Sequence, residues 1–235
     1  MKLPNYYSFF LIATFFLLTS CGSSNREKAF QSIEQGTVDS SFSKPQVNIA
    51  CVKIGNQYWA KNNLNIDHFR NGDVISEARS DEEWENAGAE GKPAWCYYNN
   101  DSSFGEKYGK LYNYYAVRDS RGIAPAGLHV ATDEEWTALS NSLGGEDIAG
   151  IKLKSASGWA EKGNGDNSSS FTALPGGYRY FSGAFFNAGQ DGSWWTATQN
   201  GEGYALLRYL YSANTNIFSN RLNFKLGLSV RCIQD

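Results

Sequence analysis

The sequence is poor in the residues that most often carry catalysis, with only two histidines, His68 and His129, among its 235 residues. Neither histidine lies in a recognisable nucleophile or metal-binding motif, and no Cys-x-x-Cys or His-x-x-x-His spacing occurs. Nucleophilic catalysis needs a nucleophile beside a base. We therefore predict that the protein is not an enzyme and that it has no catalytic residues and no metal centre.

A strong charge of either sign is also lacking, since the formal net charge is −3 and charged residues make up 19% of the chain. Proteins that bind nucleic acids usually concentrate lysine and arginine on one face or one helix. No such concentration is present here, and we expect no nucleic-acid partner.

A hydrophobic run long enough to span a bilayer is absent at the N-terminus, where the apolar stretch covers only residues 9–18. Its length and the lysine near the start are typical of a secretory signal. The run ends in Leu18-Thr19-Ser20-Cys21, which resembles the bacterial lipobox. We predict a signal peptide over 1–20 and acylation of Cys21, which places the protein in the cell envelope as an outer-membrane lipoprotein. An ordinary signal peptide or an N-terminal anchor helix is the alternative.

Residues 21–46 are rich in serine and lack periodicity, so we predict a lipidated N-terminus followed by a flexible tether. Residues 47–235 then form one domain. Three cysteines remain in it: Cys51, Cys96 and Cys232. An odd number in an exported protein indicates one pair and one free thiol, and both Cys51–Cys232 and Cys96–Cys232 stay open.

The pentapeptides SDEEW (80–84) and TDEEW (132–136) each place three carboxylates together. Ser80 and Thr132 are favourable N-caps with a glutamate three residues later, which is the capping-box pattern. Acidic residues in a first turn also suit the positive end of the helix dipole. We predict a helix start at each site, the second helix ending at Gly144-Gly145, rather than a metal site or an acid/base pair.

The remaining patterns predict mainly short strands. A hairpin is expected around Gly55-Asn56, a helix over 110–120, and a strand at IKLKS (151–155). Further short strands follow toward the C-terminus, the last of them at 225–234. Helices first and strands later give an α+β domain with an antiparallel sheet.

Eight motifs in order make a specific resemblance, among them PAGLHVATDEEWTAL, FTALPGGYR, GSWWTAT and GLSVRC. Together they cover essentially all of 50–233 and resemble the Fibrobacter succinogenes major paralogous domain, found mostly in exported proteins and lipoproteins of Bacteroidetes and Fibrobacteres. The resemblance implies a C-type-lectin-like domain, with two short helices packed on a twisted antiparallel sheet and the N- and C-terminal strands paired. That pairing favours a Cys51–Cys232 disulfide. Members often carry cysteine where Phe104 and Ala124 stand here, so the usual disulfide pattern is not preserved.

The segment 204–224 is the best candidate binding surface, because its tyrosines, asparagines and serines are the residues that paratopes favour. In related diversified receptors the matching segment displays the binding residues. The predicted contacts are Trp195, Arg208, Tyr209, Tyr211, Asn214, Asn216, Phe218 and Asn220. For Trp195 the reasoning is that adjacent residues of a strand face opposite ways, so one of Trp194-Trp195 should be core. A plain strand–loop–strand with solvated polar residues is the alternative.

Oxygen-bearing side chains in 164–170, together with Asp147 and Asp191, leave a structural Ca²⁺ as an alternative to simple turns.

The overall expectation is a lipid-anchored envelope protein that presents a non-catalytic binding or adhesion module for a glycan or protein ligand. A structural or assembly component of the cell surface is the second interpretation. A formylglycine-generating type of enzyme is the third, disfavoured by the absence of its paired cysteines, and a Cys96–His129 thiolate pair is a weak signal.

Overall fold

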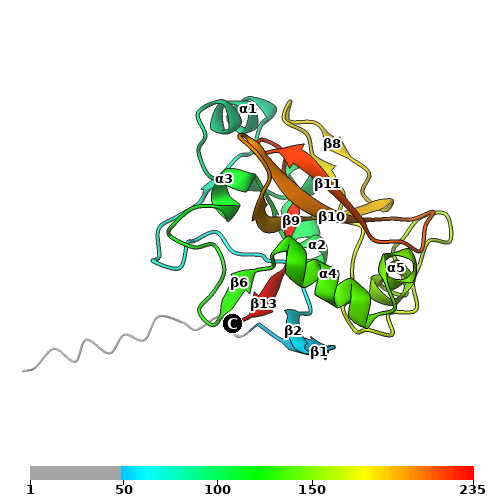
Figure 1. Ribbon diagram of the computed structural model, residues 1–235. Coiled ribbons are helices and arrows are strands. Elements are labelled where there is room, and N and C mark those ends of the chain that lie inside the picture. The colour runs from blue at the N-terminus through cyan, green and yellow to red at the C-terminus, as the bar shows by residue number, and fades with distance from the viewer. Residues whose placement is uncertain (1–48) are drawn as a thin grey trace, which may run out of the picture. The chain divides into compact units, whose positions relative to one another are not determined.

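A computed structural model describes residues 49–235, so the predicted signal peptide, Cys21 and the tether lie outside the described residues. The described chain is a mixed α+β domain with several sheets (Figure 1). Its helices are α1 (Asp81–Ala89), α2 (Gly105–Tyr108), α3 (Tyr114–Val117), α4 (Asp133–Ser142) and α5 (Glu146–Leu153), with two short 3₁₀ turns at Tyr98–Asn100 and Ser102–Phe104. None of the helices in this range has the length and apolar character needed to cross a bilayer.

One sheet joins the two ends of the domain, as expected. It has the order β1-β2-β13-β6 and is antiparallel throughout. Gly55 takes a φ of 59° in the turn between β1 and β2, which confirms the predicted hairpin. The strands are β1 (Cys51–Ile54), β2 (Gln57–Ala60), β6 (Leu128–Val130) and β13 (Cys232–Gln234).

A second sheet, with the order β11-β10-β9-β12, has α4 packed against it beside α5 (Figure 1). Its strands are β9 (Asp191–Gln199), β10 (Tyr204–Tyr211), β11 (Phe218–Asn223) and β12 (Ser229–Val230). Two smaller sheets complete the fold, formed by β3 (Ser76–Glu77), β4 (Ala94–Cys96) and β5 (Leu111–Tyr112), and by β7 (Tyr178–Arg179) and β8 (Phe185–Phe186).

Trp194 and Trp195 divide the hydrophobic core, because successive residues of β9 point to opposite faces. Trp195 belongs to the cluster with Tyr112 and Val230, whereas Trp194 belongs to the cluster with Trp136. Both rings are fully buried. The surface role predicted for Trp195 is therefore wrong: its strand is covered on both faces, so both tryptophans are core.

The two acidic pentapeptides do begin helices. In α4 the Thr132 hydroxyl accepts from the Glu135 amide, and the Glu135 carboxylate accepts from the Thr132 amide, which completes the predicted capping box. In α1 only half of the box forms, because the Glu83 carboxylate accepts from the amide of Arg79 instead of Ser80. The carboxylates therefore satisfy amides at helix starts.

The aspartate of each pentapeptide also pairs with a buried arginine. Asp133 receives two hydrogen bonds from Arg208, at 2.7 and 2.9 Å, and Asp81 receives one from Arg179 at 3.2 Å. Arg208 lies in β10 and also donates to Glu146, at the start of α5, at 2.6 Å. Arg208 thus connects one strand to two helices inside the domain. Its predicted role as a ligand contact is wrong.

The predicted Cys51–Cys232 disulfide is not formed, and the three cysteines of the described range are free thiols. Cys51 pairs with Ala60 from one side, and the register of Ile233 with Trp59 puts Cys232 beside Ala60 on the other side. Two strand spacings separate Cα atoms by about 10 Å. A disulfide needs a separation below about 7 Å. The terminal strands share a sheet, but β2 lies between them.

Two local predictions fail for lack of tertiary information. The segment 151–155 reads as a strand, but residues 151–153 complete α5 and Lys154 makes only an isolated bridge with Ala173. The expected helix over 110–120 is divided into β5 and the single turn of α3, because Asn113 caps α3 through its contact with the Ala116 amide. The helix count is accordingly larger than the two helices expected.

Replacing Arg208 with alanine should lower the free energy of unfolding by about 3 kcal/mol, because two carboxylates lose a buried partner. Arg208→Lys should recover only part of this loss, since an ammonium cannot reproduce the bidentate contact. Urea denaturation measures both. The exposed Arg79–Glu77 pair supplies a matched control, and Arg79→Ala should cost less than about 1 kcal/mol. Equal losses for Arg208→Ala and Arg79→Ala would contradict this account.

His129 should make the stability of the domain depend on pH. Its burial opposes the charged ring, but hydrogen bonds of 2.8 Å to Glu135 and to Asp235 outweigh burial and raise its pKa. A raised folded-state pKa gives stability that is present below the unfolded pKa of about 6.5 and is lost as pH rises through the folded value. The stability difference between wild type and His129→Gln should thus shrink from pH 6 to pH 9 in urea titrations; a difference independent of pH would refute it.

Candidate functional site

A cavity of about 230 Å³ lies where the turn between β10 and β11 meets α5. We call it the loop pocket. Its walls come from the end of α5, from the loop 161–164 and from the turn 212–215. The residues that line it are Ile151, Lys154, Glu161, Lys162, Gly163, Asn164, Ser212, Ala213, Asn214 and Thr215. The predicted binding segment 204–224 thus contributes one wall of this half-open pocket.

Lys154 fixes the turn between β10 and β11 through hydrogen bonds. Its ammonium donates to the carbonyl oxygens of Tyr211 and Asn214, both at 2.6 Å, and lies 4.9 Å from the centre of the Trp159 ring. The residue is buried, and burial lowers the pKa of its amine to about 8. The accepting carbonyls favour the charged form. Lys154 therefore closes the turn in the way a bound cation would.

Side chains of the turn also bind α5. The Thr215 hydroxyl donates to the Asp147 carbonyl, and the Asn216 amide donates to the Asp147 carboxylate, both at 2.9 Å. The chains approach so closely that a Cβ at Gly150 would lie 2.4 Å from the Thr215 carbonyl oxygen. The turn is consequently held on two sides by short contacts.

Asn214 is an exposed polar side chain of the turn that lines the loop pocket. The Ser212 hydroxyl is buried in the wall and has no hydrogen-bond partner within the described residues. An unpaired buried hydroxyl is costly. Because this hydroxyl has almost no accessible surface, a ligand would first meet Asn214 and not Ser212.

The other predicted contacts fall in different places. The register puts Tyr209 opposite Phe218, and their rings stack at 5.1 Å on the face that also carries Tyr211 and the exposed Asn220. Asn216 is half-buried against α5. The structure thus gathers part of the predicted set on one strand face and part in the turn, and the sequence did not indicate the roles of Lys154 and Ser212.

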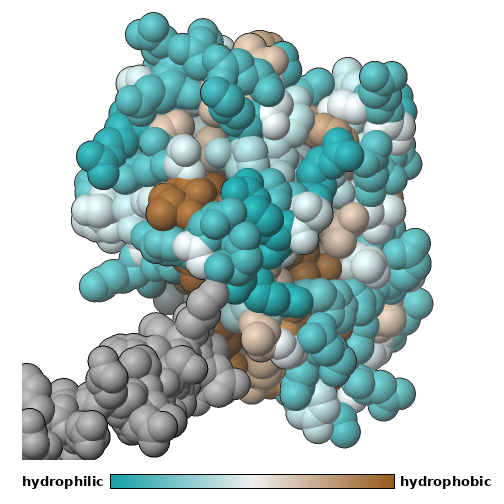
Figure 2. Space-filling view, turned by 90° about the vertical axis from the view of Figure 1, so that its left-hand side faces the viewer, coloured by the Kyte–Doolittle hydropathy of each residue, from teal (hydrophilic) through white to brown (hydrophobic). Residues whose placement is uncertain are grey.

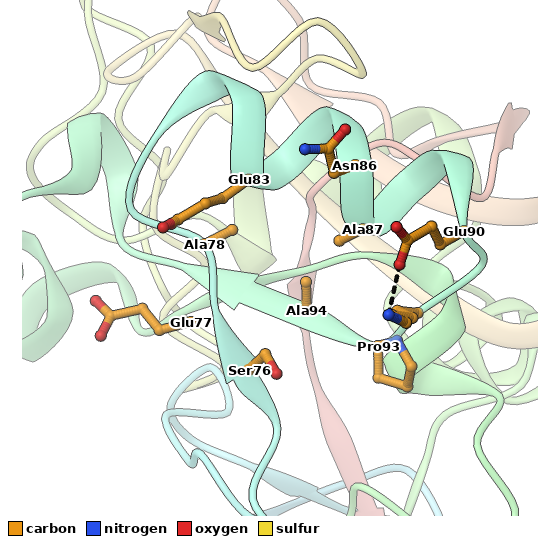
Figure 3. A pocket seen from close by; sticks show the side chains of 10 residues that line it. Ser76, Glu77, Ala78, Glu83, Asn86, Ala87, Glu90, Pro93 and Ala94 are labelled. Atoms are coloured by element: carbon orange, nitrogen blue, oxygen red, sulfur yellow. Dashed lines mark ion pairs between the residues drawn. The ribbon is translucent and has the colours of Figure 1, made fainter.

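A second cavity, of about 260 Å³, lies between α1 and the strands β3 and β4 (Figure 3). Three glutamates surround a floor of alanine side chains. Two of the three charges are matched, because Glu77 pairs with Arg79 and Glu90 pairs with Lys92 at 2.5 Å, and Glu83 accepts from the backbone amide of Arg79. One carboxylate without a cationic partner, already engaged at a helix start, is a poor holder of a cation.

Metal ligands do not gather within residues 49–235, where no three histidine, cysteine or acidic side chains form a metal-binding group. The side chains considered for Ca²⁺ have other partners: Asp166 accepts from the Ser168 amide, Asp147 from Asn216, and Asp191 from Asn187. These contacts favour the turn interpretation of 164–170.

Cys96 and His129, which the sequence suggested as a thiolate pair, lack the properties that such a pair requires. Both ring nitrogens of His129 are taken by Glu135 and Asp235. Burial raises the pKa of the Cys96 thiol to about 12, which keeps it protonated at neutral pH. The Cys96–His129 pair is therefore wrong.

Comparison with known proteins places the chain in a family. The model of the Fibrobacter succinogenes major domain matches residues 52–234, which is nearly the whole described range. No curated protein and no solved structure matches the chain. Because the match spans well over half of the sequence, the chain belongs to the Fibrobacter succinogenes major domain family.

Proposed function

We propose that the protein is a lipid-anchored component of the bacterial cell envelope that presents a non-catalytic binding module for a glycan or protein ligand. The observation that carries the proposal is the loop pocket, in which the exposed Asn214 stands on a turn fixed by Lys154. A site held in its binding geometry loses little entropy when a ligand binds.

The lipid anchor rests on Leu18-Thr19-Ser20-Cys21 at the end of the apolar run. Acyl chains on Cys21 would tether the domain through residues 22–46 to the outer membrane, with about 0.8 kcal/mol of membrane affinity for each buried CH₂. The polar, serine-rich tether would leave the domain free to meet ligands away from the bilayer.

A C-type-lectin-like architecture is part of the same proposal. It is supported by the sheet that joins β1 and β13 through β2 and by helices that begin at the two acidic pentapeptides. Fold alone does not give function, so the binding role depends on the loop pocket and not on this likeness.

A non-catalytic role is supported by the state of the candidate nucleophiles. Cys96 is a buried thiol with a raised pKa, and the Lys154 amine is occupied by backbone carbonyls. A formylglycine-generating type of activity has no support in these groups. A structural or assembly role at the cell surface remains the alternative, and the binding experiment separates it from the first proposal.

Asn214→Ala should weaken ligand binding by about fivefold or more, because it removes an exposed polar partner from the loop pocket, whereas Ser212→Ala should weaken it less, because that hydroxyl is buried. The measurement is binding of the full chain, purified in detergent, to glycan and protein arrays. Asn214→Ala is the sharper variant, since its side chain is exposed at the loop pocket. Asn56→Ala, in another exposed turn, is the control.

Unchanged binding by both pocket variants would refute the loop pocket as the site. Absence of any ligand, together with co-purification of envelope proteins, would support the structural or assembly role instead.

Replacing Cys21 with alanine should move the protein from the membrane fraction to the soluble fraction, because the acyl acceptor is lost. Fractionation with immunoblotting measures this, and the intact mass of the wild-type protein should correspond to a chain that begins at Cys21 and carries acyl groups. Cys51→Ala, which removes a free thiol of the domain, should stay membrane-bound. A Cys21→Ala protein that remains with membranes would rule out the lipid anchor.

A further inference from the structure

The side chains of the hairpin formed by β7 and β8 alternate between its two faces. Tyr178 pairs with Phe186 and Arg179 pairs with Phe185, so the two pairs point to opposite sides. Arg179 and Phe185 face the interior, where the guanidinium lies 4.6 Å from the centre of the Phe185 ring. Tyr178, Phe186 and, by the same alternation, Tyr180 face outward.

Arg179 fixes this hairpin to the body of the domain. The residue is fully buried and donates to the carbonyl oxygens of Ala78, Ser80 and Gly183, each at 2.9 Å. Gly183 allows the close approach, with a φ of 88° and a Cβ position only 2.4 Å from the Asp81 side chain. The hairpin, yellow in Figure 1, is therefore held firmly against the domain, and with it the side chains on its outer face.

The outer face carries a cluster of exposed aromatic rings, which we call the hairpin patch: Tyr178, Tyr180, Phe181 and Phe186. Tyr180, Phe181 and Phe186 are 38%, 45% and 42% exposed. Tyr178 stacks on Phe186 with ring planes 27° apart, and Tyr180 stands at 86° to Phe186. Two of the rings are thus nearly parallel, and Tyr180 stands almost perpendicular to one of them. In the view of Figure 2, by contrast, hydrophobic side chains appear as small areas separated by hydrophilic ones.

Size and charge restrict what the hairpin patch can bind. Three rings of about 200 Å² at roughly two-fifths exposure offer about 250 Å². A stable protein interface needs about 800 Å² from each partner. The only charged residue in 178–187 is Arg179, which is buried. A small aromatic surface whose neighbouring carboxylates, Asp81 and Asp191, are engaged by Arg179 and Asn187 suits the apolar C–H face of a sugar ring better than a globular protein or an anion.

Polar groups border the rings where sugar hydroxyls would lie. Asn187 follows Phe186 and donates to the Asp191 carboxylate at 2.7 Å, and burial, followed by the nearby Asp191 charge, raises the pKa of the Tyr178 phenol. The second oxygen of Asp191 is buried without a partner within the described residues, so the exposed Asn187 amide is the group that meets a ligand. A side-chain amide beside aromatic rings offers hydroxyls both a donor and an acceptor.

We propose that the hairpin patch is a binding platform for a neutral glycan, whose sugar rings stack on Tyr178, Tyr180, Phe181 and Phe186. The platform lies outside the loop pocket, and the inference holds whether or not the loop pocket binds a ligand.

The test uses the full chain in detergent, titrated by calorimetry with neutral cello-, xylo- and manno-oligosaccharides of four to six sugars. Binding of at least one series is expected, and Phe181→Ala and Phe186→Ala should each weaken it about tenfold or more through loss of ring contact. Phe181→Tyr, which keeps the ring, should bind within about twofold of wild type. Tyr58→Ala and Tyr204→Ala, which remove rings of similar exposure elsewhere, should leave the affinity unchanged.

Thermal melts of every variant accompany the titrations, so that loss of binding by a folded Phe181→Ala protein counts for the proposal. Failure to bind any neutral oligosaccharide, preference for an anionic polygalacturonate, or equal losses in the hairpin and control variants would each overturn it. Because Asn214→Ala leaves the hairpin intact, an effect of Asn214→Ala without one of Phe181→Ala would assign binding to the loop pocket alone.

Discussion

Pairing between buried guanidinium groups and the carboxylates at two helix starts is the constraint on which the domain depends. Arg208 contacts Asp133 and Glu146, and Arg179 contacts Asp81 and the backbone beside it. A buried arginine is tolerated only when its donors are satisfied, so each one fixes the segments around it. Arg208 fixes the strand that precedes the turn of the loop pocket, and Arg179 fixes the hairpin that carries the hairpin patch. Both candidate binding surfaces are thus held by the same kind of interaction.

A third arginine shows how the interior joins the ends of the domain. Arg231 is buried and donates to Asn63, whose side-chain oxygen also accepts from the Trp194 indole at 2.8 Å. Arg231 lies 4.1 Å from the centre of the Phe171 ring. Hydrogen-bonded arginines and tryptophans therefore connect the sheet of β1 and β13 with β9, in a domain whose cysteines are free thiols.

Local signals predicted what local physics determines. Thr132 and Glu135 satisfy each other within one turn, so the capping box was readable from the sequence. Arg208 was misassigned because its burial depends on α4, and Trp195 because its burial depends on Tyr112, Tyr114 and a neighbouring strand, contacts that no short pattern reveals. Lys154 stands in an alternating segment, and its carbonyl partners lie 57 to 60 residues further along the chain. Family membership was predicted correctly because eight short motifs kept their order.

A double-mutant cycle between Arg208 and Asp133 tests the central claim most directly. The free energies of unfolding of Arg208→Ala, Asp133→Asn and the double variant, compared with wild type, isolate the energy of the contact itself. The account predicts a coupling energy above about 1.5 kcal/mol, because the pair is bidentate and its guanidinium is buried. A coupling energy below about 0.5 kcal/mol would show that the acidic helix starts do not hold the strand, and would contradict the account.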